Sequence, residues 1–154
     1  MLETPHVAVG AAIATKIPNP FISIPLALVS HFVLDRVPHW NPHTYTETMK
    51  YGIPTKKTIT ITMVDILTAL ATGFYIASLA LPDKTKFMVI IAASFASVFP
   101  DVTKYPFFLF KNLRKGWYRK WVEYERKLQV SAPFWPGNLT QLITILASVV
   151  WLIK

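Results

Sequence analysis

Long apolar runs alternate with short polar interruptions along the chain. Apolar residues dominate positions 6–17, 22–35, 58–81, 87–99 and 139–153, and prolines and charged residues separate these runs. Such runs predict helices that are buried in a core or embedded in a membrane. The run 58–81 is itself long enough to cross a bilayer, which takes about 20 residues.

The spacing of these runs predicts two helical hairpins. Pro18, Asn19 and Pro20 break the chain between the first two runs, each of which is too short to span a bilayer by itself. The turn 82–86 joins the next two, with the second expected to end at Pro100. We therefore predict an all-α polytopic membrane protein, a single domain over residues 1–154, with about five apolar helices in two hairpins plus a C-terminal helix.

Two polar stretches interrupt this pattern. Residues 40–57 contain two prolines and a glycine and are expected to form a loop. Residues 104–127 interleave basic and aromatic side chains, which is typical of an interfacial segment whose rings lie at headgroup level. We expect the segment from Lys104 to Lys127 to bind membrane lipid through anionic headgroups, and we expect no nucleic acid.

Charge distribution predicts the orientation in the membrane. The chain is 53% hydrophobic and 16% charged, with a formal net charge of +8. Of its 16 Lys and Arg, all but Lys16, Lys84, Lys86 and Lys154 fall in the loops 36–57 and 101–137. The positive-inside rule places those loops in the cytoplasm. Because no basic residue precedes the first apolar run, we expect that run to belong to the mature protein.

Ionisable residues recur every fourth position in the stretch SHFVLDRVPHW. His31 and Asp35 share one helix face, and Pro38 is expected to end the helix before His39. Imidazole nitrogen and carboxylate oxygen suit a divalent metal, and the absence of cysteine leaves no thiolate ligands. The alternative is that Asp35 ends the helix and His31 is a hydrogen-bonded core residue.

Other ionisable residues are predicted to lie at the same cytoplasmic mouth. Asp65 lies inside the longest apolar run, where an ionised carboxylate costs at least about 2.5 kcal/mol and needs a partner. That partner is either a Ser, Thr or Tyr side chain of a neighbouring helix or a metal or histidine, and the nearness of the predicted histidines favours the second. The hairpin topology brings His6, Asp35, Asp65 and Asp101 to one end. The candidate metal ligands are therefore His6, His31, Asp35, Asp65 and Asp101, and the candidate catalytic residues are His39 and Asp65.

Three short motifs give the chain a family resemblance. HVAVG at 6–10, SHFVLDRVPHW at 30–40 and FPD at 99–101 resemble the small bacterial membrane-bound metal-dependent hydrolases, a group distantly similar to zinc-dependent phospholipase C. His6, His31, Asp35 and Asp101 match the pattern positions, whereas VTKYPFF replaces the Thr-His-Ser motif that usually follows the Pro-Asp pair.

The resemblance implies a hydrolase of phosphoesters or lipid headgroups at the bacterial inner membrane, with a divalent cofactor such as Zn²⁺. In that reading, water bound to the ion is the nucleophile and His39 assists from beside the ligands. The alternative from the residues alone is a non-enzymatic membrane protein, a transporter subunit or scaffold, in which the Asp and His residues form a proton or ion relay.

Overall fold

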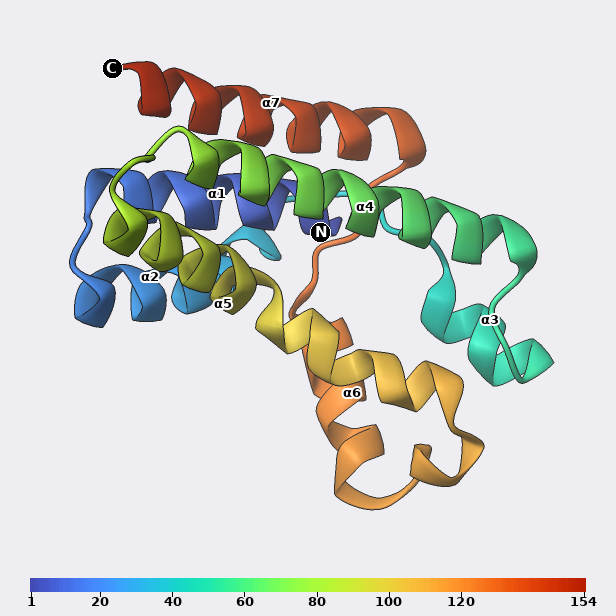
Figure 1. The fold of residues 1–154 in the computed structure, drawn as a ribbon. Helices are drawn as coiled ribbons and strands as arrows, with labels where there is room; N and C mark the ends of the chain where they lie inside the picture. The colour runs from blue at the N-terminus through green and yellow to red at the C-terminus, as the bar shows by residue number, and fades with distance from the viewer.

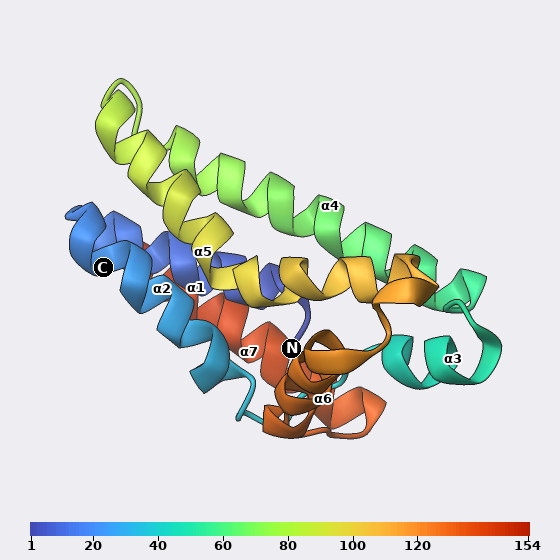
Figure 2. The ribbon, with the colours of Figure 1, turned by 90° about the horizontal axis from the view of Figure 1, so that it is seen from below.

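The fold is all-α. The computed structural model describes all 154 residues. Its helices are α1 Glu3–Lys16, α2 Pro20–Leu34, α3 Thr44–Tyr51, α4 Lys56–Ser78, α5 Lys84–Leu109, a 3₁₀ turn Lys111–Leu113, α6 Gly116–Leu128 and α7 Phe134–Ile153. Helices α1, α2, α4, α5 and α7 form one bundle, and α3 and α6 lie together at one end of it (Figures 1 and 2).

Helix α1 lies at the centre of the bundle, packed against α2, α4, α5 and α7 (Figure 1). Small residues allow this close packing, because Ala11, Ala12 and Ala14 are completely buried. A Cβ atom on Gly10 would lie 2.7 Å from Cβ of Ser97, so only glycine permits this approach of α1 to α5. The contact holds the backbone of Ser97 close to the first turns of α1.

Three helices, α4, α5 and α7, are long and apolar enough to cross a membrane, and α2 is a shorter apolar helix. Their outward faces carry large apolar side chains, including Leu67, Phe74, Met88 and Leu142, each more than half exposed. An apolar outer surface is expected where lipid replaces water as the solvent. The long apolar run predicted to cross a bilayer is therefore confirmed as a helix of sufficient length.

Helix α5 does not end at Pro100. It continues through Pro100 and Pro106 to Leu109 and bends midway (Figure 2). Proline lacks an N–H, so the carbonyl of Ala96 loses its helical donor at this point. The predicted helix end is corrected to a bend, which the packing of both halves of α5 supports.

The stretch 40–57 is not a continuous loop, because α3 forms within it. Gly52 ends this helix with φ of 85°, a left-handed conformation that favours glycine. The last helix also begins earlier than the apolar run predicts, at Phe134. Within its first turns Gly137 packs against the backbone of Trp40, since a Cβ there would lie 2.3 Å from the Trp40 nitrogen.

The basic aromatic segment divides between the end of α5, the 3₁₀ turn and α6. Trp117 and Tyr124 of α6 are exposed, whereas Val122 and Glu125 are buried against the bundle. Lys104 lies in α5 and is 8% exposed, so it is a buried residue and does not belong to the headgroup-facing surface expected for this segment. The correction follows from the continuation of α5 past Pro100.

Candidate metal centre

Asp35 lies at the centre of a buried polar cluster, at the C-terminal end of α2. Its carboxylate Oδ1 lies 3.4 Å from Nε2 of His6, and its Oδ2 lies 3.4 Å from Nε2 of His31. The amino group of Met1 donates to Oδ1, and the side-chain amide of Gln129 donates to Oδ2 at 3.2 Å. Two histidines from different helices therefore meet one carboxylate, as the sequence motifs predicted.

The hydrogen bond at the other ring nitrogen of His31 fixes its tautomer. Nδ1 lies 2.9 Å from the carbonyl oxygen of Ser97, which can only accept, so Nδ1 carries a proton. In the neutral ring Nε2 then has a lone pair, and it faces the carboxylate of Asp35 with no hydrogen bond. Two acceptors at this distance require a cation between them, either a proton on Nε2 or a metal ion.

His6 reinforces this requirement. It is completely buried, and neither of its ring nitrogens has a hydrogen-bond partner. Its ring stacks on that of His31 with centroids 4.3 Å apart, which disfavours positive charge on both rings at once. Buried nitrogens without partners are rare, and a metal ligand is one established reason for them.

Asp101 completes a set of donors that fits a divalent ion. One ring nitrogen each from His6 and His31 and one carboxylate oxygen of Asp101 all lie within 4.8 Å of one another. Ligands of a tetrahedral zinc ion are about 3.4 Å apart at bond lengths of about 2.1 Å. The widest pair would thus have to close by at most roughly 1.4 Å, which side-chain rotation can supply. Nitrogen and carboxylate donors of this kind fit Zn²⁺ or a similar ion.

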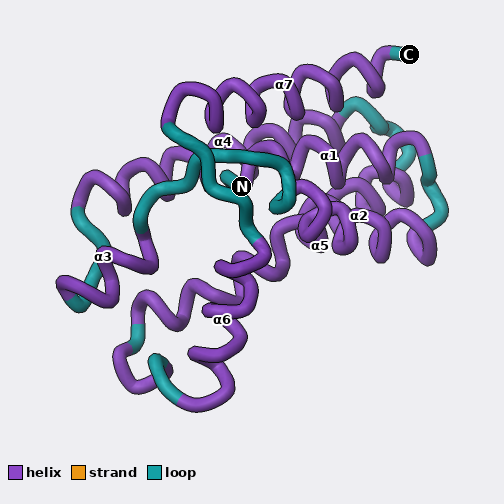
Figure 3. Tube along the Cα trace, turned by 180° about the vertical axis from the view of Figure 1, so that it is seen from behind, coloured by secondary structure: helices purple, strands orange, loops and turns teal.

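His39 lies beside this group. Its Nδ1 lies 2.7 Å from the carbonyl oxygen of Val37, and its Nε2 lies 3.9 Å from Oδ1 of Asp35. A backbone pairing holds the residue in place, because the His39 nitrogen donates to the Val130 carbonyl and the His39 carbonyl accepts from the Ala132 nitrogen. Figure 3 shows the loops that precede α3 and α7 passing close to each other. The structure thus places His39 beside Asp35 without a hydrogen bond to it, and its predicted catalytic role stays a prediction.

The electrostatics keep Asp35 ionised and His39 neutral. Burial by itself raises the pKa of the Asp35 carboxyl, but the interactions with His6 and with the positive amino terminus outweigh it and hold that pKa well below its usual range. Burial lowers the pKa of His39, and the neighbouring amino group lowers it further. A carboxylate and neutral imidazoles are the forms that bind metal ions.

Asp65 has a different partner. Its Oδ2 accepts from the backbone nitrogen of Glu3 at 2.6 Å, and its Oδ1 accepts from the hydroxyl of Thr4 at 2.7 Å. The carboxylate thus binds the free N–H groups at the start of α1, where the helix dipole also favours negative charge. The structure places Asp65 at this helix end and not among the three grouped donors. Its predicted ligand and catalytic roles stay predictions.

Replacing Asp65 with alanine is expected to destabilise the protein by about 1–2 kcal/mol, because the first turn of α1 loses a buried cap. Unfolding of the detergent-solubilised variant, followed by circular dichroism, measures the effect. The matched control is Asp83→Ala, which removes the exposed cap of α5. This substitution is expected to lower the free energy of unfolding by less. Equal stability of Asp65→Ala and wild type would contradict the capping role.

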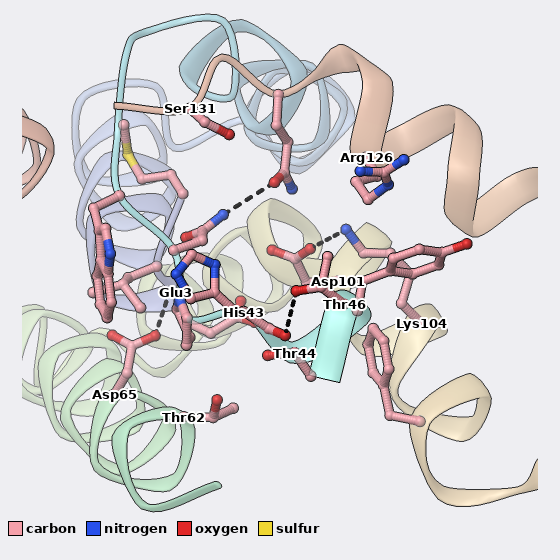
Figure 4. Close-up of a pocket in the computed structure, with 18 of the residues that line it drawn as sticks. Glu3, His43, Thr44, Thr46, Thr62, Asp65, Asp101, Lys104, Arg126 and Ser131 are labelled. Atoms are coloured by element: carbon pink, nitrogen blue, oxygen red, sulfur yellow. Dashed lines mark hydrogen bonds and ion pairs between the residues drawn. The ribbon is translucent and has the colours of Figure 1, made fainter. Parts of the chain in front are cut away.

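A polar cavity of about 340 Å³ adjoins the cluster. Asp101 lines it and is therefore shared between the cavity and the three donors. Figure 4 shows Asp101 beside Lys104 on one wall and Asp65 with Thr62 on another. The guanidinium of Arg126 stacks over the ring of Tyr45 at the rim, at 4.8 Å, without a carboxylate partner. A substrate in this cavity would contact both the candidate metal centre and a cation.

Several residues of the site could not be predicted from the pattern. Gln129 contacts Asp35 from 94 positions away, and the Ser97 carbonyl orients His31 from 66 positions away. Glu3 also lines the cavity, where its Oε1 accepts from Tyr105 at 2.7 Å and its Oε2 is buried without a partner. No local motif marks these residues.

Comparison with families of known proteins, with curated proteins and with solved structures finds no match to this chain. The class that the fold and site define is therefore an all-α protein with three helices able to span a membrane and a buried group of two histidines and an aspartate. The family resemblance of the three motifs stays a prediction.

Proposed function

We propose that this protein is a metal-dependent hydrolase of phosphoesters, acting on lipid headgroups at the cytoplasmic face of the bacterial inner membrane. The observation that carries the proposal is the meeting of three donors, one ring nitrogen each of His6 and His31 and one carboxylate oxygen of Asp101, all within 4.8 Å of one another. A divalent ion would ligate His31 Nε2 and one nitrogen of His6, neither of which has a hydrogen bond. The positive-inside distribution supports the cytoplasmic side, where α3 and α6 lie.

The residues of this chain divide into two groups by position. His6, His31 and Asp101 would hold the ion. Asp35 lies close to both imidazoles and is oriented by the hydrogen bond from Gln129, and His39 lies beside it. A bound divalent ion supplies a water of lowered pKa and polarises the phosphoryl oxygen. Three protein ligands leave a position free for that water, as in catalytic zinc sites.

The cavity wall supplies the remaining contacts. Arg126, which has no carboxylate partner, is placed to bind a phosphate group, since a guanidinium donates to phosphate in a fork. Glu3 presents a carboxyl oxygen without a partner and is placed to transfer a proton to or from bound substrate. Lys104 is neutralised by Asp101 and Glu125 and positions Asp101.

Metal content and hydrolysis together test the proposal. Protein purified in detergent is expected to contain about one divalent metal ion per chain, because a catalytic site with three protein ligands binds one ion. EDTA should abolish hydrolysis of bis-p-nitrophenyl phosphate, and Zn²⁺ should restore it. Asp101→Asn, which keeps the shape of the side chain, should lose hydrolysis, whereas the control Lys84→Gln at the far end of α5 should not.

Protein without stoichiometric metal, with a hydrolysis rate unaffected by EDTA or by Asp101→Asn, would overturn the proposal. In that event a proton on His31 Nε2 satisfies the cluster, and the buried Asp and His residues fit the relay of a non-enzymatic membrane protein.

A further inference from the structure

A second cavity lies on the apolar side of the bundle, between α4 and α5 with α1 as its floor. We call it the α4–α5 groove; it measures about 270 Å³, and its lining includes Val7, Leu70, Gly73, Phe74, Phe95 and Val98. Leu70, Phe74 and Phe95 are each more than half exposed and form its rim. Both walls belong to helices long enough to cross a membrane, so in a bilayer the groove would face lipid.

The groove adjoins the polar cavity. Glu3 and Tyr105 line both cavities, so they form the boundary between them. Their hydrogen bond joins Tyr105 to one carboxyl oxygen of Glu3 and leaves the other buried without a partner. A buried polar atom without a partner at such a boundary is available to a ligand that passes from one cavity to the other.

The groove is longer than one leaflet of a bilayer is deep, so it can hold an acyl chain along its length. Along α5 it runs from Ile91 to Tyr105, 14 positions or about 21 Å of helix. The hydrocarbon core of a bilayer is about 30 Å thick, so a chain from one leaflet extends about 15 Å. Gly73 deepens the groove, because it leaves the Val7 side chain as the floor, 3.1 Å from where a Cβ atom would lie.

We propose that the substrate is a membrane phospholipid that lies across both cavities, with its phosphate-bearing headgroup beside Asp101 and one acyl chain in the α4–α5 groove. The inference rests on the proposed hydrolase function and narrows its substrate class from phosphoesters in general to diacyl lipids drawn from the bilayer. The ester region of the lipid then lies at Glu3 and Tyr105. A water-soluble phosphodiester would fill the polar cavity alone.

Tryptophan substitutions that fill the groove test the acyl-chain site. Val98→Trp and Leu70→Trp place a large ring into the groove from its two walls, and Leu70 is exposed enough to accept the change without loss of the fold. Leu67→Trp is the matched control, because it puts the same ring on the exposed surface of α4 outside the groove. Binding of dioleoylphosphatidylglycerol to each purified variant is measured by native mass spectrometry in detergent.

The expected result is a roughly tenfold weaker binding of this lipid to both groove variants than to Leu67→Trp, the loss expected if about two methylene groups leave the groove. Hydrolysis of the lipid in mixed micelles should fall by a similar factor. Hydrolysis of bis-p-nitrophenyl phosphate should stay within about twofold of wild type, because that substrate does not reach the groove.

The two readouts separate failure of this inference from failure of the proposed function. Equal lipid binding by the groove variants and by Leu67→Trp would overturn the acyl-chain site, whatever the enzyme hydrolyses. Lipid binding that depends on the groove, in a protein that hydrolyses neither substrate with Zn²⁺ present, would instead leave a lipid-binding protein and overturn the hydrolase. If the groove variants lose lipid binding and lipid hydrolysis but keep hydrolysis of bis-p-nitrophenyl phosphate, the result supports both the acyl-chain site and the hydrolase.

Discussion

Replacing His31 with alanine is expected to lower the affinity of the purified protein for Zn²⁺ at least about 100-fold, since even partners of metal ligands contribute 10–100-fold. The reason is specific to this ring: its Nδ1 is bound to the Ser97 carbonyl, so its Nε2 faces Asp35 ready to ligate. Competition with a chromophoric chelator, on protein in detergent, measures the affinity. His6→Ala is expected to have an effect of the same order, because both of its nitrogens are buried without partners.

The control for this prediction is His43→Ala. His43 is exposed, precedes α3, and is not part of the group of donors formed by His6, His31 and Asp101. The His43→Ala substitution removes one imidazole from the protein and should leave its affinity for Zn²⁺ unchanged. If His31→Ala binds Zn²⁺ as tightly as His43→Ala does, the proposed ligand set is wrong.

Replacing Lys104 with methionine is expected to destabilise the protein by about 3–5 kcal/mol, the cost of leaving buried charge without its partner. The Lys104 amine contacts the carboxylate of Asp101 and lies 2.8 Å from that of Glu125, and all three residues are buried. Methionine keeps the volume of the side chain but leaves two carboxylates facing each other. Denaturant unfolding in detergent, followed by circular dichroism, measures the change.

A matched control and a double variant define this prediction further. Lys111→Met removes a lysine that is exposed and unpaired, so it should change stability little. Adding Glu125→Gln to Lys104→Met removes one of the two uncompensated charges and should recover part of the loss. Lys104→Met protein as stable as Lys111→Met would contradict the buried ion pair that joins α6 to α5.

Much of the helical architecture follows from the sequence, since apolar runs free of charge have no stable alternative to helix in a membrane. The run 58–81 becomes α4, and Thr55 caps its start. Two of these predictions were wrong: the end of the fourth helix at Pro100, and a continuous loop over residues 40–57. Pro100 bends α5 without ending it, because packing on both sides compensates for one missing hydrogen bond. Helix α3 was missed because it is short and flanked by turn residues.

The candidate site was predictable in part. The four-residue spacing of His31 and Asp35, together with the hairpin topology, indicated that His6 and Asp101 would approach them, and the structure brings these residues together. Asp65 needed a partner, as its position in an apolar run required, and the structure supplies the backbone at the start of α1. The contact with the Thr4 hydroxyl agrees with the alternative of a hydroxyl partner on a neighbouring helix, whereas the favoured partner was a metal or a histidine, and Asp65 lies outside the group of candidate metal donors.

The sequence by itself determined which apolar runs are helical and that several ionisable residues lie near one another at one end of the bundle, because both follow from local spacing and from the direction of each helix. Only the tertiary structure decided which atoms face each other. The tautomer of His31 depends on the Ser97 carbonyl, and that carbonyl is near because α2 packs against α5. Such contacts join residues far apart in the chain, and no local pattern encodes their distances.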